Sequence, residues 1–263
     1  MTPPRIITLT TDFGVSSPYV AAMKGVILSI NPRANIVDIT HAVPPQDVRA
    51  GAIVLADMTR WFPPESIHVA VVDPGVGTSR KIVYLRVGTQ HYIAPDNGLL
   101  SRLALAEIHS TIMTVADPQF WLPKVSATFH GRDIMAPVAA RLSLGLDPAR
   151  LGPPQADIER LDWTEARVTA NKIEGTVQSI DSFGNLITDI PEDALVNVPR
   201  GEEVTIFCDD HETHGIFQTY GDQPEMTLIA LVGSSGRLEL AIVGDSAALM
   251  LGVRAGTPVT VKW

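Results

Sequence analysis

The chain has 263 residues, of which 45% are hydrophobic and 19% are charged, a composition typical of a globular protein and long enough for two domains. Its formal net charge of −9 and the absence of a basic run argue against a nucleic-acid partner, so a small molecule is the expected one. No window approaches the roughly 18 apolar residues that a membrane span needs, and the start shows no secretory signal pattern. The lone Cys208 fits a reducing compartment, and we predict a cytoplasmic protein without membrane contact.

Strands and helices are predicted to alternate over the first 160 residues. Ser17 and Pro18 have the residue types of an N-cap and first helical position, and they predict a helix to about residue 29. The remaining elements follow from apolar periodicity: strands at 6–10, 35–40, 67–72 and 111–115, a hairpin from 82–87 and 92–94, and helices at 47–61, from 99, and at 132–144. This alternation predicts an α/β fold whose N-terminal domain is a doubly wound, largely parallel sheet.

The pattern changes after Leu146, where Pro and Gly cluster and no apolar period persists to about residue 162. We interpret this stretch as a linker and predict two domains, a catalytic α/β domain at 1–160 that includes the start of the linker and a smaller C-terminal β-barrel domain at 161–263 that binds substrate. The second domain is expected from short, turn-bounded strands at 172–180, 186–188, 204–207, 227–232, 238–243 and 259–263.

The strongest candidate for a catalytic site is the run VAVVDPGVGTSRK at 69–81. Its apolar start predicts a buried strand that ends at Asp73, and the carboxyl ends of such strands are where α/β proteins bind ligands. The same run contains Arg80, and a second stretch, FHGRD, offers the imidazole of His130 at the predicted start of a helix. We therefore expect Asp73, Arg80 and His130 to form one site.

Simpler interpretations apply to several of these residues. Asp73 before Pro-Gly is also a common turn residue, and the glycines at 75–80 do not match a dinucleotide fingerprint. Asn97 with Gly98 is most simply a turn. His211 and His214 lie beside two aspartates, but we place them in a polar loop and predict no metal site.

Seven motifs in order resemble one known family. They are TDFG at 11–14, YV at 19–20 with KG at 24–25, VDPGVGT at 72–78, APDNGLL at 94–100, FHGRD at 129–133, Asp181 with FGN at 183–185, and Gly236 with Leu238 and Glu239. Together they resemble the S-adenosyl-L-methionine hydrolase (hydroxide adenosyltransferase) family, which is related to the bacterial fluorinase and chlorinase. The resemblance covers essentially the whole chain.

The resemblance implies hydrolysis of S-adenosyl-L-methionine to adenosine and L-methionine, without a cofactor. It also implies a homotrimer, with substrate between the N-terminal domain of one subunit and the C-terminal domain of its neighbour. A sulfonium is an activated leaving group, so the site needs a water held in line with the C5′–S bond and a dry environment. Arg80 can stabilise a developing hydroxide, His130 can accept a proton near its ordinary pKa of about 6.5, and Asp73 can orient the water or Arg80. Which of the three is the proton acceptor stays open.

The resemblance also assigns substrate-binding residues. Asp12 would accept hydrogen bonds from the ribose hydroxyls, and Glu239 would face either the methionine amine or solvent. The cleft would be completed by Asp181, Phe183, Asn185, Ser234 and Gly244, with Asn185 and Ser234 at the methionine end and the Gly244 backbone at adenine. Two departures, Ser17 in place of the Asp of many relatives and the charged Asp245, bear on how tightly the methionine end is held.

The sequence leaves two alternative functions open. An adenosyl-halide synthase would use a desolvated halide in place of water, but fluorinase has phenols at the positions of Asp73 and His130 and a serine at that of Gly131. A non-catalytic sensor of adenosine or S-adenosylmethionine is the other alternative. Product analysis with and without chloride distinguishes the three functions.

Overall fold

The computed structural model describes residues 5–104 and 111–263. The chain divides into two compact units, Met1–Asp162 and Trp163–Trp263, and each is described by itself. The division falls two residues after the predicted end of the first domain. The chain is a two-domain α/β protein, as the sequence predicts.

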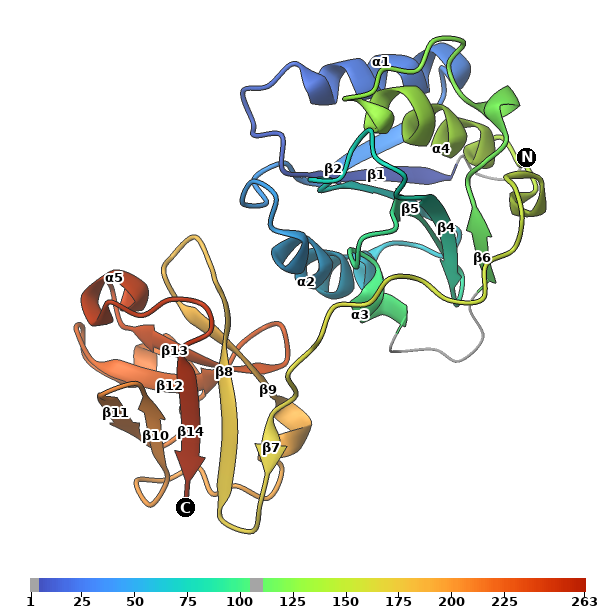
Figure 1. Ribbon diagram of the computed structural model, residues 1–263. Helices are drawn as coiled ribbons and strands as arrows, with labels where there is room; N and C mark the ends of the chain where they lie inside the picture. Colours follow the sequence, from blue (N-terminus) through green and yellow to red (C-terminus); the bar gives the residue numbers. More distant parts are fainter. Residues whose placement is uncertain (1–4, 105–110) are drawn as a thin grey trace. The chain divides into compact units, whose positions relative to one another are not determined.

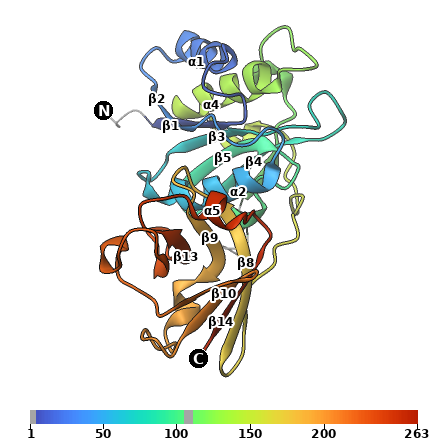
Figure 2. The same ribbon diagram turned by 90° about the vertical axis from the view of Figure 1, so that its left-hand side faces the viewer.

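Unit 1 is built on a mixed sheet (Figures 1 and 2). Its strands are β1 (Ile6–Thr11), β2 (Asn35–Thr40), β3 (Ile67–Val71), β4 (Ile82–Val87), β5 (Gln90–Pro95) and β6 (Thr111–Thr114), in the order β2-β1-β3-β5-β4-β6. β1 pairs in parallel with β2 and β3, and β3 pairs in parallel with β5. β4 runs antiparallel to both β5 and β6. The parallel half therefore includes β1 and β3, whose carboxyl ends lead to Asp12 and Asp73.

Helices cover both faces of this sheet (Figure 1). α1 (Tyr19–Ile30) and α4 (Ala136–Ser143) pack on one face, and α2 (Val48–Met58) and α3 (Ser101–Ala104) on the other. β3 is buried along its length because both faces are covered, which explains its continuous apolar sequence. Within residues 5–104 and 111–263, no helix is long and apolar enough to cross a membrane.

Two predicted helices differ in detail from the structure. α1 begins at Tyr19, and the Ser17 hydroxyl accepts a hydrogen bond from the Tyr19 backbone N–H at 3.3 Å rather than serving as the N-cap. The predicted helix at 132–144 begins as a π-helical turn, η3 (Gly131–Met135), which continues into α4. Single π turns inside helices are frequent at functional sites, and this one follows His130.

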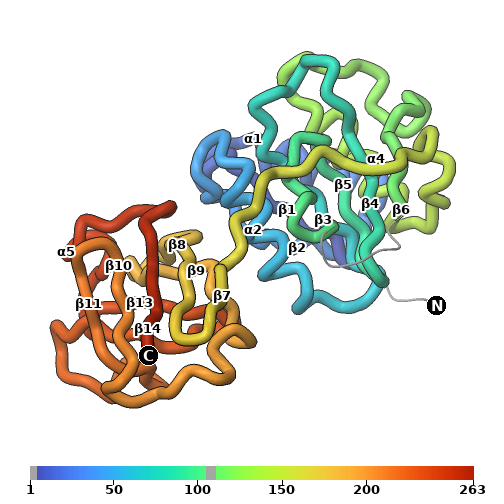
Figure 3. Tube along the Cα trace, turned by 60° about the horizontal axis from the view of Figure 1, so that its bottom comes forward, coloured from blue at the N-terminus to red at the C-terminus, as the bar shows by residue number. Residues whose placement is uncertain are grey.

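The stretch predicted as a linker is packed against unit 1 (Figure 3). The Ala116 N–H donates to the Leu151 carbonyl, and Leu151 is fully buried. Farther along, the Glu159 N–H donates to the Asp96 carboxylate at 2.8 Å, and Leu161 lies against Gly98. The polar, proline-rich composition did not predict this packing, because the contacts are backbone hydrogen bonds and a few scattered apolar side chains. The unit consequently extends to Asp162.

Unit 2 is a nearly closed antiparallel barrel. Its strands are β7 (Arg167–Val168), β8 (Lys172–Ile180), β9 (Leu186–Pro191), β10 (Thr205–Cys208), β11 (His211–His214), β12 (Leu228–Val232), β13 (Arg237–Ile242) and β14 (Pro258–Lys262), in the path β11-β10-β14-β8-β9-β13-β12. The end strands approach each other where the Thr213 hydroxyl donates to the Leu228 carbonyl at 2.6 Å. The sequence missed β7, β11 and the short helix α5 (Ala247–Leu251).

Candidate functional site

Asp73 is the second residue after β3, in the loop that connects β3 to β4. The loop folds back on itself, since the Val76 N–H donates to the Asp73 carbonyl at 3.2 Å. Asn97 fixes the preceding residue, because its side-chain amide donates to the Val72 carbonyl at 2.9 Å. Asn97, interpreted from sequence as only a turn residue, therefore joins the loop after β5 to the end of the strand that carries Asp73.

Asp73, Arg80 and His130 lie in one hydrogen-bonded group, as predicted. Arg80 binds Asp73 with two N–H groups, from Nε to Oδ1 at 2.8 Å and from Nη2 to Oδ2. The same Nη2 lies 2.9 Å from Nδ1 of His130. The side chains of Asp73 and Arg80 are only 5% and 9% exposed, so this pair is shielded from solvent. Such a bidentate, buried pair holds both partners in a defined orientation.

The contact with Arg80 defines the tautomer of His130. A guanidinium has only donors, so Nδ1 must be the acceptor and the proton of the neutral imidazole must be on Nε2. Burial lowers the pKa of His130, and the positive charge of Arg80 lowers it further, while Asp73 and Asp133 act in the opposite direction. His130 is therefore neutral at neutral pH and presents an N–H donor rather than a free acceptor.

Two glycines allow the loops to meet. A Cβ on Gly77, which has φ +79°, would lie 2.4 Å from the Ala127 carbonyl oxygen, so the Asp73 loop rests directly on the backbone of the segment that leads to His130. A Cβ on Gly131 would meet both methyl groups of Val71 at 3.2 and 3.3 Å. Small residues at both positions are needed for His130 to come within hydrogen-bond distance of Arg80.

Two of the three residues, Asp73 and His130, border a cavity of about 280 Å³ at the carboxyl end of the sheet. Its wall consists of Asp12, Phe13, Gln46, Val71, Asp73, Pro74, Val76, Thr128, Phe129, His130 and Gly131. Asp73 and His130 are part of this wall. Arg80 contacts both of them but does not itself line the cavity. Arg80 thus holds two cavity-facing groups rather than forming the wall itself.

Asp12 enters the same cavity from the loop after β1. Its Oδ2 accepts the backbone N–H of Gln46 at 2.8 Å, and Gln46 has the unusual φ of +65°. Non-glycine residues in this region are strained and concentrate at functional sites. Sequence reasoning missed Gln46, since a backbone contact leaves no signal in residue type. The bond leaves Oδ1 and the remaining lone pair of Oδ2 free to accept further donors.

Three candidate residues from the second half of the chain, Phe183, Asn185 and Gly244, line a different cavity, within unit 2. This cavity of about 640 Å³ is lined by Phe183, Asn185, Tyr220, Ile242, Gly244, Asp245 and Ser246. Phe183 is 77% exposed, so it is not a core residue. Asp181 organises the turn beneath it, since its carboxylate accepts the backbone N–H groups of Phe183 and Asn185, each at 2.9 Å, and the Asn185 amide at 3.0 Å.

Glu239 is buried and faces neither solvent nor the open cavity. Its carboxylate accepts the hydroxyl of Tyr220 at 2.5 Å, and burial raises the pKa of Glu239. Tyr220 in turn lies 3.5 Å from the Asn185 amide nitrogen and lines the cavity. Burial and the contact with Glu239 also raise the pKa of Tyr220, so its hydroxyl stays protonated and donates. Tyr220 was missed because it lies in a short polar 3₁₀ turn, Tyr220–Asp222, that has no apolar period.

The structure also places three further positions, Ser234, Asp245 and Ser17. Ser234 is exposed on the turn between β12 and β13 and is not among the lining residues; the adjacent Gly233 lies against the Glu239 carboxylate. Asp245 does line the cavity, and its carboxylate accepts the Ser246 N–H at 2.7 Å. Ser17 bonds only to the backbone of Tyr19 among the contacts described for it.

His211 and His214 belong to strand β11 rather than to a loop, which corrects the prediction made for them. His211 Nε2 lies 3.1 Å from the Leu251 carbonyl, and His214 Nδ1 lies 3.3 Å from the Thr205 hydroxyl. In the part of the chain that the structure describes, no three His, Cys, Asp or Glu side chains are grouped as metal ligands.

Family models match both units. Residues 7–152 match the SAM hydroxide adenosyltransferase N-terminal domain, and residues 175–260 match the C-terminal domain of the same family. The chain belongs to this family. The order of the two matches follows the division between the units, and each candidate residue named above falls inside one of them.

Proteins similar to this chain include some named hydrolase and some named fluorinase. The (R)-S-adenosyl-L-methionine hydrolase of Salinispora tropica is 39% identical over 99% of each chain. A fluorinase of Nocardia brasiliensis is 29% identical over 98% of this chain and 96% of its own. Among solved structures, an uncharacterized conserved protein from Thermotoga maritima aligns with a TM-score of 0.93 at 36% identity, covering 98% of this chain and 100% of its own. The similarity to all three extends over both units.

Proposed function

We propose that this protein hydrolyses S-adenosyl-L-methionine to adenosine and L-methionine by in-line attack of water at C5′ of the ribose. The observation that carries the proposal is the hydrogen-bonded group of Asp73, Arg80 and His130 at the edge of a cavity that Asp12 also lines. It is supported by a hydrolase that is 39% identical over 99% of the chain. The substrate needs no acid catalysis, because the departing sulfur leaves as a neutral thioether.

In the proposed mechanism the water is held between Asp73 and His130. His130 donates its Nε2–H to the water oxygen, and Asp73 accepts a water proton through a lone pair that Arg80 leaves free. The water oxygen then bonds to C5′ while the C5′–S pair moves to sulfur, and the proton passes to the Asp73 carboxylate and on to solvent. Arg80 keeps both groups aligned, which supplies the positioning that such a step needs. This assigns the acceptor role to Asp73, one of the alternatives that the sequence leaves open.

The halide alternative is disfavoured by the same geometry. A halide needs donors and no acceptor, yet Asp73 presents an anionic carboxylate to the cavity. Bringing a second anion beside this carboxylate in a low-dielectric site is costly. A water molecule donates as well as accepts, so it matches a site that offers an acceptor, Asp73, and a donor, His130.

The substrate-binding roles are also proposals. Asp12 has free lone pairs for the ribose 2′- and 3′-hydroxyls, since Gln46 occupies only one of them. In unit 2, Phe183, Asn185 and the Gly244 backbone are proposed to contact the substrate, with Ser234 at the methionine end. Asp181 and Glu239 support them, because they hold Asn185 and Tyr220 in place.

We further propose that the protein is a cytoplasmic homotrimer with the substrate between subunits. The proposal is supported by the division of candidate residues between two units and by exposed apolar side chains near the unit 2 cavity, Phe183 at 77% and Leu249 at 85% exposure. Exposed apolar groups that cluster are usually covered by a partner. Light scattering coupled to size-exclusion chromatography is expected to give three times the mass of 28.3 kDa, and a monomer would contradict this arrangement.

The experiment for the activity compares the two sulfonium epimers of S-adenosylmethionine. The relatives named hydrolase specify the R configuration, so we expect release of adenosine and methionine from the R epimer. Products are separated by chromatography, and binding of either epimer is measured in parallel by calorimetry. Binding of both epimers without product would support a sensor and overturn the proposed hydrolysis.

A further inference from the structure

Asp133 is a buried carboxylate close to the catalytic group. It has no role in the proposed mechanism. It is fully buried, and it follows His130 by three residues in the π turn. It accepts the Ser126 backbone N–H at 2.8 Å and two N–H groups of Arg132, at 2.6 and 2.9 Å. A buried carboxylate is costly unless it is fully paired, so this arrangement needs all three bonds.

These contacts enclose the segment that carries His130. Ser126 lies at one end and Asp133 at the other, so the bond between them closes a loop containing Thr128, Phe129 and His130, and each of these three lines the cavity. The backbone adds to the closure, because the Asp133 N–H donates to the Phe129 carbonyl at 3.1 Å. The two ends of the loop are therefore joined by hydrogen bonds as well as by the polypeptide chain itself.

Arg132 connects this closure to the cavity wall. Its guanidinium lies over the Phe129 ring at 4.8 Å while its N–H groups bind Asp133. Phe129 in turn contacts Phe13 and Tyr19 edge-to-face, at 5.7 and 5.1 Å between ring centroids. The position of His130 thus depends on an ion pair on one side and on an aromatic cluster on the other.

We propose that Asp133 is a positioning residue for the hydrolytic reaction: by closing the 126–133 loop and holding Arg132 on Phe129, it places the His130 imidazole against Arg80. The kinetic part of this inference rests on the proposed function. The structural part concerns the orientation and environment of His130, and it does not rest on the proposed function. A shift of about 1 Å in such a group can lower a rate by on the order of 10²-fold.

The test is Asp133→Asn, which keeps the shape and the acceptor for Ser126 but removes the charge that pairs with Arg132. The charged groups that act on the pKa of His130 are Arg80, which lowers it, and Asp73 and Asp133, which raise it. Loss of the Asp133 charge should therefore move the His130 imidazole titration, followed by NMR without substrate, to lower pH. We expect kcat to fall about tenfold or more with KM nearly unchanged, and the acidic limb of the rate profile to move in the same direction.

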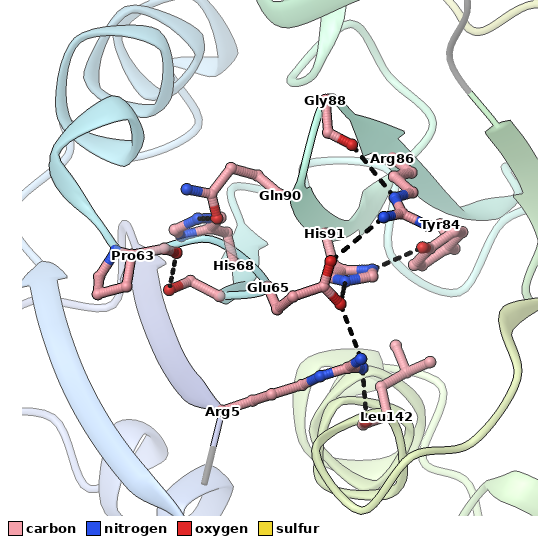
Figure 4. A network of polar contacts seen from close by, with 11 residues as sticks. Arg5, Pro63, Glu65, His68, Tyr84, Arg86, Gly88, Gln90, His91 and Leu142 are labelled. Carbon is pink, nitrogen blue, oxygen red and sulfur yellow. Dashed lines mark hydrogen bonds and ion pairs between the residues drawn. The ribbon is translucent and has the colours of Figure 1, made fainter. Parts of the chain in front are cut away.

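Glu65→Gln is the matched control. Glu65 pairs with Arg5, Arg86 and His91 at 2.7, 3.2 and 3.1 Å (Figure 4). Glu65 precedes β3, whereas Asp73 follows the other end of that strand. Neutralisation of Glu65 also breaks a network in unit 1, so it should lower stability while leaving the His130 titration and kcat at their wild-type values. This separates a positioning effect from general loss of stability.

A folded Asp133→Asn protein with an unmoved His130 titration and wild-type kcat would overturn the proposal. If that variant does not fold, Arg132→Gln replaces it, since the Arg132 side chain is 36% exposed. This variant should lower kcat at constant KM, with partial recovery in Arg132→Lys, and a wild-type kcat would again overturn the proposal. If the wild-type protein itself does not hydrolyse S-adenosylmethionine, the proposed function fails, and the NMR titration still decides whether Asp133 acts on His130.

Discussion

Arg80 donates from Nη2 to Nδ1 of His130 over 2.9 Å while it holds the Asp73 carboxylate with the same group and with Nε. Because a guanidinium cannot accept, this bond makes the neutral imidazole an Nε2–H donor. Proton transfer to His130 would require the bond to Arg80 to break first. The structure therefore favours Asp73 as the acceptor, and His130 as the donor that orients the water.

His130→Asn tests this division of roles. The Asn carbonyl can accept from Arg80 as Nδ1 does, but it does not titrate, so the acidic limb that His130 causes should disappear while a substantial part of the rate above that limb is retained. In the wild type, burial and Arg80 lower the pKa of His130, so activity is present above that pKa and is lost as the pH falls through it. The measurement is kcat/KM from pH 4 to 9. Loss of nearly all activity at every pH would identify His130 as the base.

Arg80→Ala should lower kcat and kcat/KM together, by about 10²–10³-fold, with little change in substrate affinity. The reason is that Arg80 aligns two groups that act on the water, and it does not line the cavity in the described structure. Steady-state kinetics combined with calorimetry gives both quantities. A variant that binds poorly but turns over normally would place Arg80 in the binding surface.

Asp12→Ala should weaken binding of adenosine and of substrate by on the order of 2 to 3 kcal/mol, because bonds to a carboxylate are lost in the ground and transition states alike. Calorimetry measures this directly. Asp147→Ala is the control, since Asp147 is also an acidic residue of unit 1 but caps the 3₁₀ turn Pro148–Arg150. Equal losses of affinity in the two variants would contradict the assigned role of Asp12.

His68 makes the folded state sensitive to acid. Burial lowers its pKa to about 4, and it is held neutral between Thr8 at 2.7 Å and Gln90 at 3.3 Å. In the unfolded chain its pKa returns to about 6.5. Stability is therefore full above about pH 6.5 and decreases by about 3 kcal/mol as the pH falls to about 4.

Urea unfolding across this pH range measures the effect. His68→Phe should be less stable at neutral pH, because Thr8 and Gln90 lose a partner, yet its stability should depend less on pH below 6.5. A variant with the same acid dependence as the wild type would show that other groups cause it.

The convergence of Asp73 and His130 was predictable, because Asp73 follows a strand that ends at the carboxyl edge of the sheet and His130 precedes a helical segment that was expected to begin at the same edge. The hydrogen bond that defines the tautomer of His130 was not, since it depends on side-chain placement across a separation of 50 residues. For the same reason the sequence indicated Asp12 but not Gln46, whose contribution is a backbone N–H.

The fold was predicted best where apolar residues form long periodic runs, as in β3 and the helices on either side of its sheet. The fold was predicted less well where hydrogen bonds, rather than buried apolar side chains, hold a segment in place. Residues 147–162 have a linker composition but are bonded to unit 1, and β11 has a polar sequence because only Thr213 of its four residues is buried. Tyr220, in a polar turn, was lost for the same reason.

Attack of water at C5′ is tested most directly by incubation with S-adenosylmethionine in ¹⁸O-water without halide, followed by mass spectrometry of the nucleoside. We expect adenosine labelled at the 5′ oxygen, released together with methionine. Unlabelled adenosine, or 5′-chloroadenosine as the main product once chloride is added, would contradict it.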